Sequence, residues 1–145
     1  MSEQIADEVL RAVARINRWA SSRSTFELPT AQARLLGHID DLQPVRVTTL
    51  AAADHSSQPG VTAQVNRLQE AGLVERVADD TDARASLLRL TSKGAQSLAR
   101  TRHQRARTLA PLLDELPPDQ LDDLRRGLAV LTDLLTPTAP TSRKD

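Results

Sequence analysis

Hydrophobic residues along the chain recur at two spacings, one typical of helices and one typical of strands. Near the start, apolar residues follow one another at steps of three and four. They are Ile5, Val9, Val13, Ile16 and Ala20. This spacing places them on one stripe and predicts an amphipathic helix over about 4–21. Ser21-Ser22-Arg23-Ser24 follows and should break it.

Two shorter helices are predicted next. Thr30 is predicted to cap a helix from Ala31 to Ile39, and Pro44 should end any continuation. Residues 45–47 could form a very short strand. Thr48 or Thr49 would then cap a brief helix that ends at a turn over 54–56.

The following helix carries the clearest division into two faces. Ser57 can cap it, Pro59 suits its first turn, and residues 71–72 should end it. Its apolar line is Val61, Val65 and Leu68, so the residues facing away from the core are Thr62, Ala63, Asn66 and Arg67. Asn66 and Arg67 can make paired hydrogen bonds to adenine or guanine. The alternative is an ordinary solvated helix face.

Two short segments of alternating residues, 73–77 and 86–90, flank a polar loop and predict a β-hairpin. The order of these elements predicts a winged helix-turn-helix over 30–92: a short helix, a turn, a capped helix and a hairpin. This fold puts one helix into a DNA groove. In the loop, we expect Asp82 to hold Arg84 by a charge-assisted hydrogen bond and to aim its guanidinium into a minor groove. An exposed surface ion pair is the alternative.

The last third of the chain is predicted to be helical. Thr91 can cap a long helix over 92–116, in which Pro111 should produce a kink or a boundary. Pro117-Pro118 ends it, and another helix over 118–136 follows. Its leucines keep the spacing of a helix-packing seam. They are Leu121, Leu124, Leu128, Leu131 and Leu135. Residues 137–145 are expected to be a flexible tail.

Composition narrows the class of partner. A chain of 145 residues suits a single domain with a real core, which we expect over 1–136. The charges balance, with 19 basic and 19 acidic residues, so positive potential for DNA would have to be local. Arginines cluster accordingly, at 84 and 89 and then at 100, 102, 105 and 107. Trp19 and Phe26 are the only aromatic residues, which argues against stacking of single-stranded nucleic acid.

Sequence signals for other classes of protein, such as enzymes and membrane proteins, are absent. There is no cysteine, which excludes disulfides and thiolate chemistry. No Gly-rich phosphate loop, nucleophile elbow or clustered acid–base pair is present, so we expect no enzyme and no cofactor. The start is acidic and no apolar run is long enough to span a bilayer, which makes a cytoplasmic protein the default.

With these residues in view, the chain resembles the MarR family of bacterial transcription regulators over nearly its whole length. The resemblance rests on Asp82-Ala83-Arg84 with Leu87, Leu90-Thr91 and Gly94, together with Leu50-Ala51, Val61, Leu68 and 71–74. It implies a homodimer of mostly α subunits with a small β-hairpin, whose helices over 4–21 and 118–136 interleave. It implies a recognition helix over 57–71 and a minor-groove contact from Arg84. Combined with the exposed face, the candidate DNA contacts are Ser57, Gln58, Thr62, Ala63, Asn66, Arg67, Asp82 and Arg84.

Three residues depart from the family pattern. Asp54 and Gln64 stand where the family usually has apolar residues, and Ser56 replaces a branched aliphatic residue. Either the helix-turn-helix is locally less well packed, or side-chain hydrogen bonds such as one from Asp54 to a helix terminus compensate.

The resemblance also implies a regulator of double-stranded DNA that binds a near-palindromic operator, expected to be a repressor released by a small anionic aromatic effector. Candidate effector residues are Arg15, Trp19, Arg23 and His38. Two alternatives stay open. A metal-responsive regulator could use His38, His55 and His103, although no metal-binding spacing joins them, so no metal ligands are assigned. An interaction module that kept the winged fold without reading DNA would explain the balanced charge.

Overall fold

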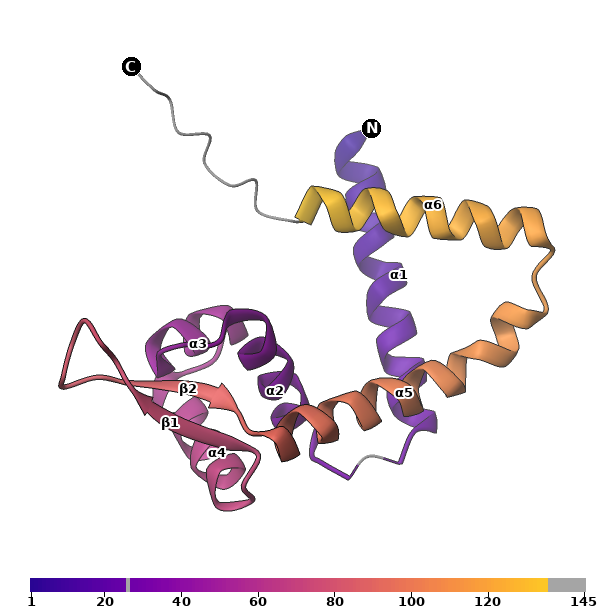
Figure 1. Cartoon of the computed structure of the whole chain (residues 1–145). Helices are drawn as coiled ribbons and strands as arrows, with labels where there is room; N and C mark the ends of the chain where they lie inside the picture. Colours follow the sequence, from indigo (N-terminus) through magenta and orange to yellow (C-terminus); the bar gives the residue numbers. More distant parts are fainter. Residues whose placement is uncertain (26, 136–145) are drawn as a thin grey trace. The chain divides into compact units, whose positions relative to one another are not determined.

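The computed structural model describes residues 1–25 and 27–135, and within them the chain forms six helices and one two-stranded sheet (Figure 1). In order, the elements are α1 (Ser2–Arg23), α2 (Thr30–Leu42), α3 (Val47–Asp54), α4 (Gln58–Glu70), β1 (Val74–Ala78), β2 (Ser86–Leu90), α5 (Ser92–Asp114) and α6 (Pro118–Leu135). The prediction of a mostly α protein with a small β-hairpin is confirmed.

Contacts divide the chain into two compact units, Met1–Thr108 and Leu109–Asp145, so the boundary falls within α5. The predicted single domain over 1–136 stays a prediction. The expected tail over 137–145 lies outside the described residues.

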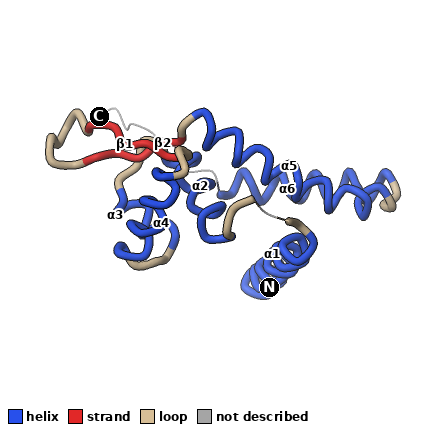
Figure 2. The backbone as a smooth tube through the Cα atoms, turned by 90° about the horizontal axis from the view of Figure 1, so that it is seen from below, coloured by secondary structure: helices blue, strands red, loops and turns tan. Residues whose placement is uncertain are grey.

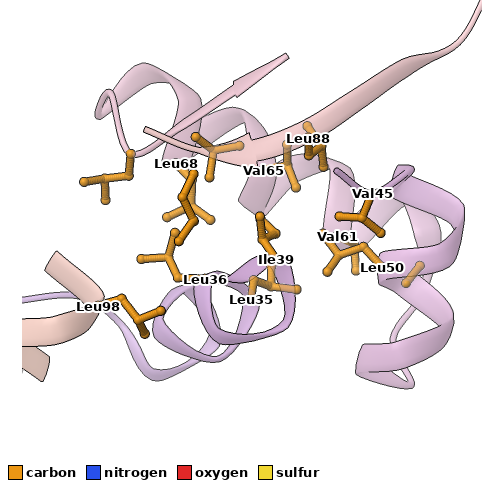
Figure 3. Packing of buried hydrophobic residues seen from close by; sticks show 14 residues of the cluster. Leu35, Leu36, Ile39, Val45, Leu50, Val61, Val65, Leu68, Leu88 and Leu98 are labelled. Atoms are coloured by element: carbon orange, nitrogen blue, oxygen red, sulfur yellow. The ribbon is translucent and has the colours of Figure 1, made fainter. Parts of the chain in front are cut away.

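The core lies where α2, α3 and α4 meet the hairpin. Side chains from these elements converge in Figure 3, and Leu36, Ile39 and Leu68 are completely buried. The apolar line predicted for α4 is confirmed, because Val61, Val65 and Leu68 are all buried. Removing this apolar surface from water is the main force that holds the three short helices together.

The hairpin closes this core from one side. β1 and β2 pair antiparallel from Val74 opposite Leu90 to Ala78 opposite Ser86. Val45 adds a single bridge to Leu88 through two backbone hydrogen bonds of 3.0 and 2.7 Å, which replaces the short strand predicted around it. The loop that joins the strands extends beyond α3 and α4 in both views (Figures 1 and 2).

The hairpin and α5 meet at a glycine. The side chain of Thr91 accepts a hydrogen bond of 3.0 Å from the amide of Gly94, so Thr91 caps α5 as predicted. A Cβ atom on Gly94 would lie 1.9 Å from the carbonyl oxygen of Leu73. Glycine therefore allows the first turn of α5 to approach the residue that precedes β1.

Helix boundaries depart from the predictions at several ends. α1 continues through Ser21-Ser22-Arg23, with Ser24 as its C-cap, since serine within a helix is tolerated at a small cost. Thr30 is the first residue of α2, not its N-cap, and α2 continues to Leu42. Arg46, not Thr48 or Thr49, precedes α3, where the described residues contain no side-chain cap.

The end of α5 and the whole of α6 belong to the second unit. Pro111 lies inside α5, so it does not end the helix, although the unit boundary falls three residues before it. Among the described residues, no helix is long and apolar enough to cross a membrane.

Two helices keep much of their apolar stripe exposed. In α1, Ile5, Val13 and Ile16 are about half exposed, and only Ala20 is buried. In α6 no described residue is fully buried, and Leu128 is 54% exposed. Each unit by itself therefore leaves a row of apolar side chains in contact with solvent.

Candidate nucleic-acid interface

The exposed face of α4 is polar and open. Ser57 caps the helix, since its hydroxyl oxygen accepts a hydrogen bond of 3.2 Å from the amide of Gly60, and Pro59 occupies the first turn. Both features were predicted. The outward face surrounds a shallow hollow of about 470 Å³, lined by Gln58, Pro59, Thr62, Ala63 and Asn66. Most of the predicted DNA contacts, Arg67 included, thus lie on one exposed helix together with its cap.

One carboxylate fixes the stem of the wing, here defined as the loop 79–85 between the strands. Asp79 accepts hydrogen bonds from the amide and hydroxyl of Thr81 at 2.9 and 2.7 Å, and from the guanidinium of Arg46. The Thr81 hydroxyl and amide, followed by Arg46, hold the pKa of Asp79 at about 2. Because Arg46 precedes α3, this contact joins the wing to the helix-turn-helix.

At the wing tip, the predicted contact between Asp82 and Arg84 takes a different form. Asp82 Oδ1 accepts a hydrogen bond of 3.0 Å from the backbone amide of Arg84, and among the described residues no ion pair joins the two side chains. A second turn bond runs from the amide of Ala85 to the carbonyl of Asp82. Asp82 therefore shapes the turn, because its short side chain reaches the nearby amide more easily than the distant guanidinium. The expected alternative, a surface ion pair, is also not found there.

Ion pairing separates the cations of the winged segment into two groups. Arg34, Arg46 and Arg89 form salt bridges. Their partners are Asp54, Asp79 and Glu75, respectively. In the described part of the chain, Arg67, Arg76 and Arg84 have no carboxylate partner, and Arg76 bonds only to the neutral Gln69 and Ser86. Unpaired guanidinium groups are the ones available to phosphate or base edges without first losing an internal contact.

The arginine cluster predicted on α5 is mostly engaged within the first unit. Arg100, Arg102 and Arg105 donate hydrogen bonds to other parts of that unit. The acceptors are Glu27, Asp40 and Asn17. These contacts tie α5 to α1, to α2 and to the segment between them, so the cluster is a structural feature more than a free positive surface.

Asp54, Ser56 and Gln64, which depart from the pattern of the resembled family, all form side-chain hydrogen bonds. Arg34 of α2 donates two hydrogen bonds to Asp54, at 2.6 and 3.2 Å, and the Ser56 hydroxyl donates a third. The Arg34 hydrogen bond is the main cause of a lowered pKa at Asp54. Gln64 accepts a hydrogen bond of 3.3 Å from Gln32. Side-chain hydrogen bonding is thus the observed compensation, although the partner of Asp54 is a guanidinium and not a helix terminus.

The candidate effector residues do not share one site. Arg23 lies over the ring of Trp19, with its guanidinium carbon 4.8 Å from the ring centroid, while Arg15 is exposed. His38 Nε2 lies 3.5 Å from Asp54 Oδ1. A cavity of about 370 Å³ lies instead between α1, α2 and α5, and none of these four residues lines it. Its polar lining comes from Asn17, Ser21, Thr30, Arg34, Thr101, Arg102 and Arg105.

The histidines are equally scattered. His55 adopts a left-handed conformation at the turn after α3, with φ of 53°, and His103 is exposed on α5. Within residues 1–25 and 27–135, no three histidine, cysteine, aspartate or glutamate side chains are grouped to hold a metal ion.

Comparison with known proteins shows which fold this geometry belongs to. A sequence model described as the MarR family matches residues 26–85, from just before α2 to the end of the wing. RV1404 from Mycobacterium tuberculosis has 22% identity and a TM-score of 0.74, with 97% of each chain covered. The chain has the fold of MarR-family transcriptional regulators. A MarR family protein from Bacillus stearothermophilus has 21% identity and the same TM-score of 0.74, with 94% of this chain and 99% of that chain covered.

A further structure with the MarR fold contains nucleic acid. A point mutant of MepR from S. aureus, bound to an oligodeoxyribonucleotide, has 16% identity and a TM-score of 0.62, with 90% of this chain and 98% of that chain covered. Comparison with curated protein sequences gives no match. The MarR fold and the matched segment agree with the resemblance drawn from the sequence.

Proposed function

We propose that the protein is a sequence-specific regulator of transcription that binds double-stranded DNA as a homodimer. The observation that carries the proposal is the exposed, polar face of α4 beside a wing whose Arg84 has no carboxylate partner among the described residues. A helix exposed in this way fits a major groove, and a protruding arginine fits the adjacent minor groove. The DNA-bound MepR structure, which shares the fold, supports the same use of it.

The candidate contacts divide by role in this proposal. Ser57 and Gln58, at the helix N-terminus, lie against phosphate, where amides and the helix dipole favour an anion. Thr62, Ala63, Asn66 and Arg67 face base edges. Asp82 shapes the turn that presents Arg84 to the minor groove.

Homodimerisation would cover the exposed apolar rows of α1 and α6. Ile5 is 53% exposed and Leu128 is 54% exposed, and exposed rows of apolar side chains of this kind mark an interaction site. A second copy of the chain is the partner that also places two recognition helices on one duplex. A near-palindromic operator follows from such a twofold arrangement.

Repression relieved by a small anion is the proposed mode of regulation. The cavity between α1, α2 and α5 supports it, because Arg34, Arg102 and Arg105 all line a space of about 370 Å³. An anion bound there would compete with their present partners, Asp54, Asp40 and Asn17. Benzoate is a suitable probe. It should raise the melting temperature of the protein and weaken its DNA binding; if neither changes, the effector proposal fails.

The DNA-binding proposal is tested by fluorescence anisotropy with genomic duplex fragments at low salt. Arg84→Ala should weaken binding roughly tenfold, the size expected when one groove contact is lost. Arg107→Ala makes the same charge change on α5, outside the winged segment, and serves as the matched control with little effect. If the wild-type protein bound neither genomic nor random duplex, the winged lobe would instead be an interaction module, which its balanced charge favours.

A further inference from the structure

We propose that Arg34 and Asp54 form a clamp that sets the position of the N-terminal half of α4, and thereby the sequence specificity of DNA binding. The inference rests on the proposed function and adds to it two positioning residues outside the expected DNA contacts. Neither residue lies on α4: Arg34 is in α2, and Asp54 is the last residue of α3.

The carboxylate of the clamp is shielded from solvent and accepts hydrogen bonds at both oxygens. The Asp54 side chain is only 2% exposed, while that of Arg34 is 51% exposed. Arg34 donates through Nε and Nη2 to the two carboxylate oxygens, and Ser56 adds its hydroxyl. A bidentate guanidinium–carboxylate contact fixes direction as well as distance, and breaking it leaves a buried charge without its partner.

At this end of α4, polar contacts accompany the apolar packing of a single buried side chain, that of Val61. A hollow of about 310 Å³ lies beside the clamp, and its lining includes Gly60, Val61 and Gln64 of α4. At the C-terminal half of the same helix, Val65 and Leu68 are completely buried. The core therefore holds the C-terminal half through Val65 and Leu68, whereas Val61 anchors the N-terminal half and the clamp adds polar contacts there.

A very short segment of chain connects the clamp to α4. His55 and Ser56 alone separate Asp54 from the cap residue Ser57. The turn is tied down by backbone hydrogen bonds from His55 to Ala52 and from Ser56 to Ala51, at 3.2 and 3.1 Å. A displacement of Asp54 must therefore move Ser57 and the first turn of α4, where the proposed DNA contacts begin.

The test compares specific and random duplex binding, melting temperature and amide hydrogen exchange in full-length variants. Asp54→Asn should lower affinity for the preferred duplex about tenfold, leave affinity for random duplex within about threefold, and speed exchange at amides 58–62. The paired variant Arg34→Leu with Asp54→Leu replaces the clamp by apolar contact and should restore slow exchange and specific affinity. Asp40→Asn breaks another ion pair of α2, that with Arg102, and is the matched control.

The outcomes separate the clamp from the proposed function. If Asp54→Asn keeps slow exchange at amides 58–62 and an unchanged ratio of specific to random affinity, the clamp does not position α4. A loss of both affinities in equal proportion, accompanied by a lower melting temperature, would show a general structural role and would also overturn it. If the wild-type protein binds no duplex, the proposed function fails, and the exchange comparison still decides whether the clamp exists.

Discussion

Asp79 shows how one carboxylate can connect two parts of a small fold. It accepts hydrogen bonds from Thr81 within the wing and from Arg46 ahead of α3, and its side chain is 7% exposed. Its neighbour Asp80 is exposed. The two residues are adjacent in sequence and identical in chemistry, so only the tertiary structure distinguishes their roles.

The first prediction concerns how Asp79 makes the stability of the fold depend on pH. Its pKa of about 2 lies below the value near 3.9 of an unfolded chain, so its contribution to stability is complete above roughly pH 4 and is lost as pH falls through 2. Asp79→Asn should lower the melting temperature at pH 7 and flatten its decline between about pH 4 and pH 2. Thermal unfolding monitored by circular dichroism measures both.

Asp80→Asn is the matched control for that experiment, and it should leave the whole pH profile close to that of the wild type. Equal profiles for the wild-type protein and Asp79→Asn would show that the contacts of Asp79 contribute nothing to folding.

At the scale of single elements, the first turn of α4 is held by its N-cap together with the buried side chain of Val61. The hydroxyl of Ser57 satisfies an amide that the helix itself cannot. Thr48, near the start of α3, has the same kind of side chain, but in the described structure α3 has no side-chain cap. The two residues therefore offer a direct comparison between a capping hydroxyl and one that caps no helix.

The second prediction follows from that comparison. Ser57→Ala should lower the free energy of unfolding by about 1 kcal/mol, the usual cost of removing an N-cap. Thr48→Ala should change it by less than about 0.5 kcal/mol, as surface substitutions do. Urea denaturation of both variants provides the two values. Equal losses would mean that Ser57 does not act as a cap in solution.

Sequence periodicity predicted the elements and the faces of α4 well, because spacing alone determines which residues share a helix face. Ion pairs between residues far apart in the sequence could not be predicted in the same way. Arg34 and Asp54 are 20 residues apart, and Arg46 and Asp79 are 33 apart, so each pair forms only after the helices pack. Asp54 did give a signal as a polar residue at an apolar position, yet nothing in the sequence indicated Arg34.

Local hydrogen bonding was the other reason why predictions from the sequence differed from the structure. Asp82 was expected to bind the Arg84 guanidinium, but the backbone amide of the same residue is closer to a short side chain. Thr30 was expected to cap α2, but helical geometry begins at Thr30 itself. In both cases the residue type was compatible with several local structures, and the sequence did not rank them.

At the scale of the whole molecule, the two exposed apolar rows and the balanced charge belong together. A chain with 19 basic and 19 acidic residues attracts DNA weakly over its general surface. Binding would then depend on a few unpaired arginines placed in the grooves, and two copies of the chain double their number. Dimerisation is in this way part of the proposed binding mechanism.

The third prediction tests dimerisation directly. Leu128→Glu places a charge on the exposed row of α6 and should convert a dimer into a monomer, since burying the carboxylate at an apolar interface is costly. Leu42→Glu makes the same change at a residue of similar exposure, 42%, on α2 and should leave the dimer intact. Light scattering coupled to gel filtration gives the mass of each. A monomeric wild-type protein would contradict the dimer proposal.

Selection of bound sequences from random duplex DNA by the purified protein tests the central claim most directly. We expect an enriched motif with twofold symmetry, whose half-sites are about one helical turn, roughly 34 Å, apart. We also expect Asn66→Ala to change the bases selected within each half-site, because that side chain faces the major groove in this account. A library that shows no enrichment after repeated rounds would contradict the claim.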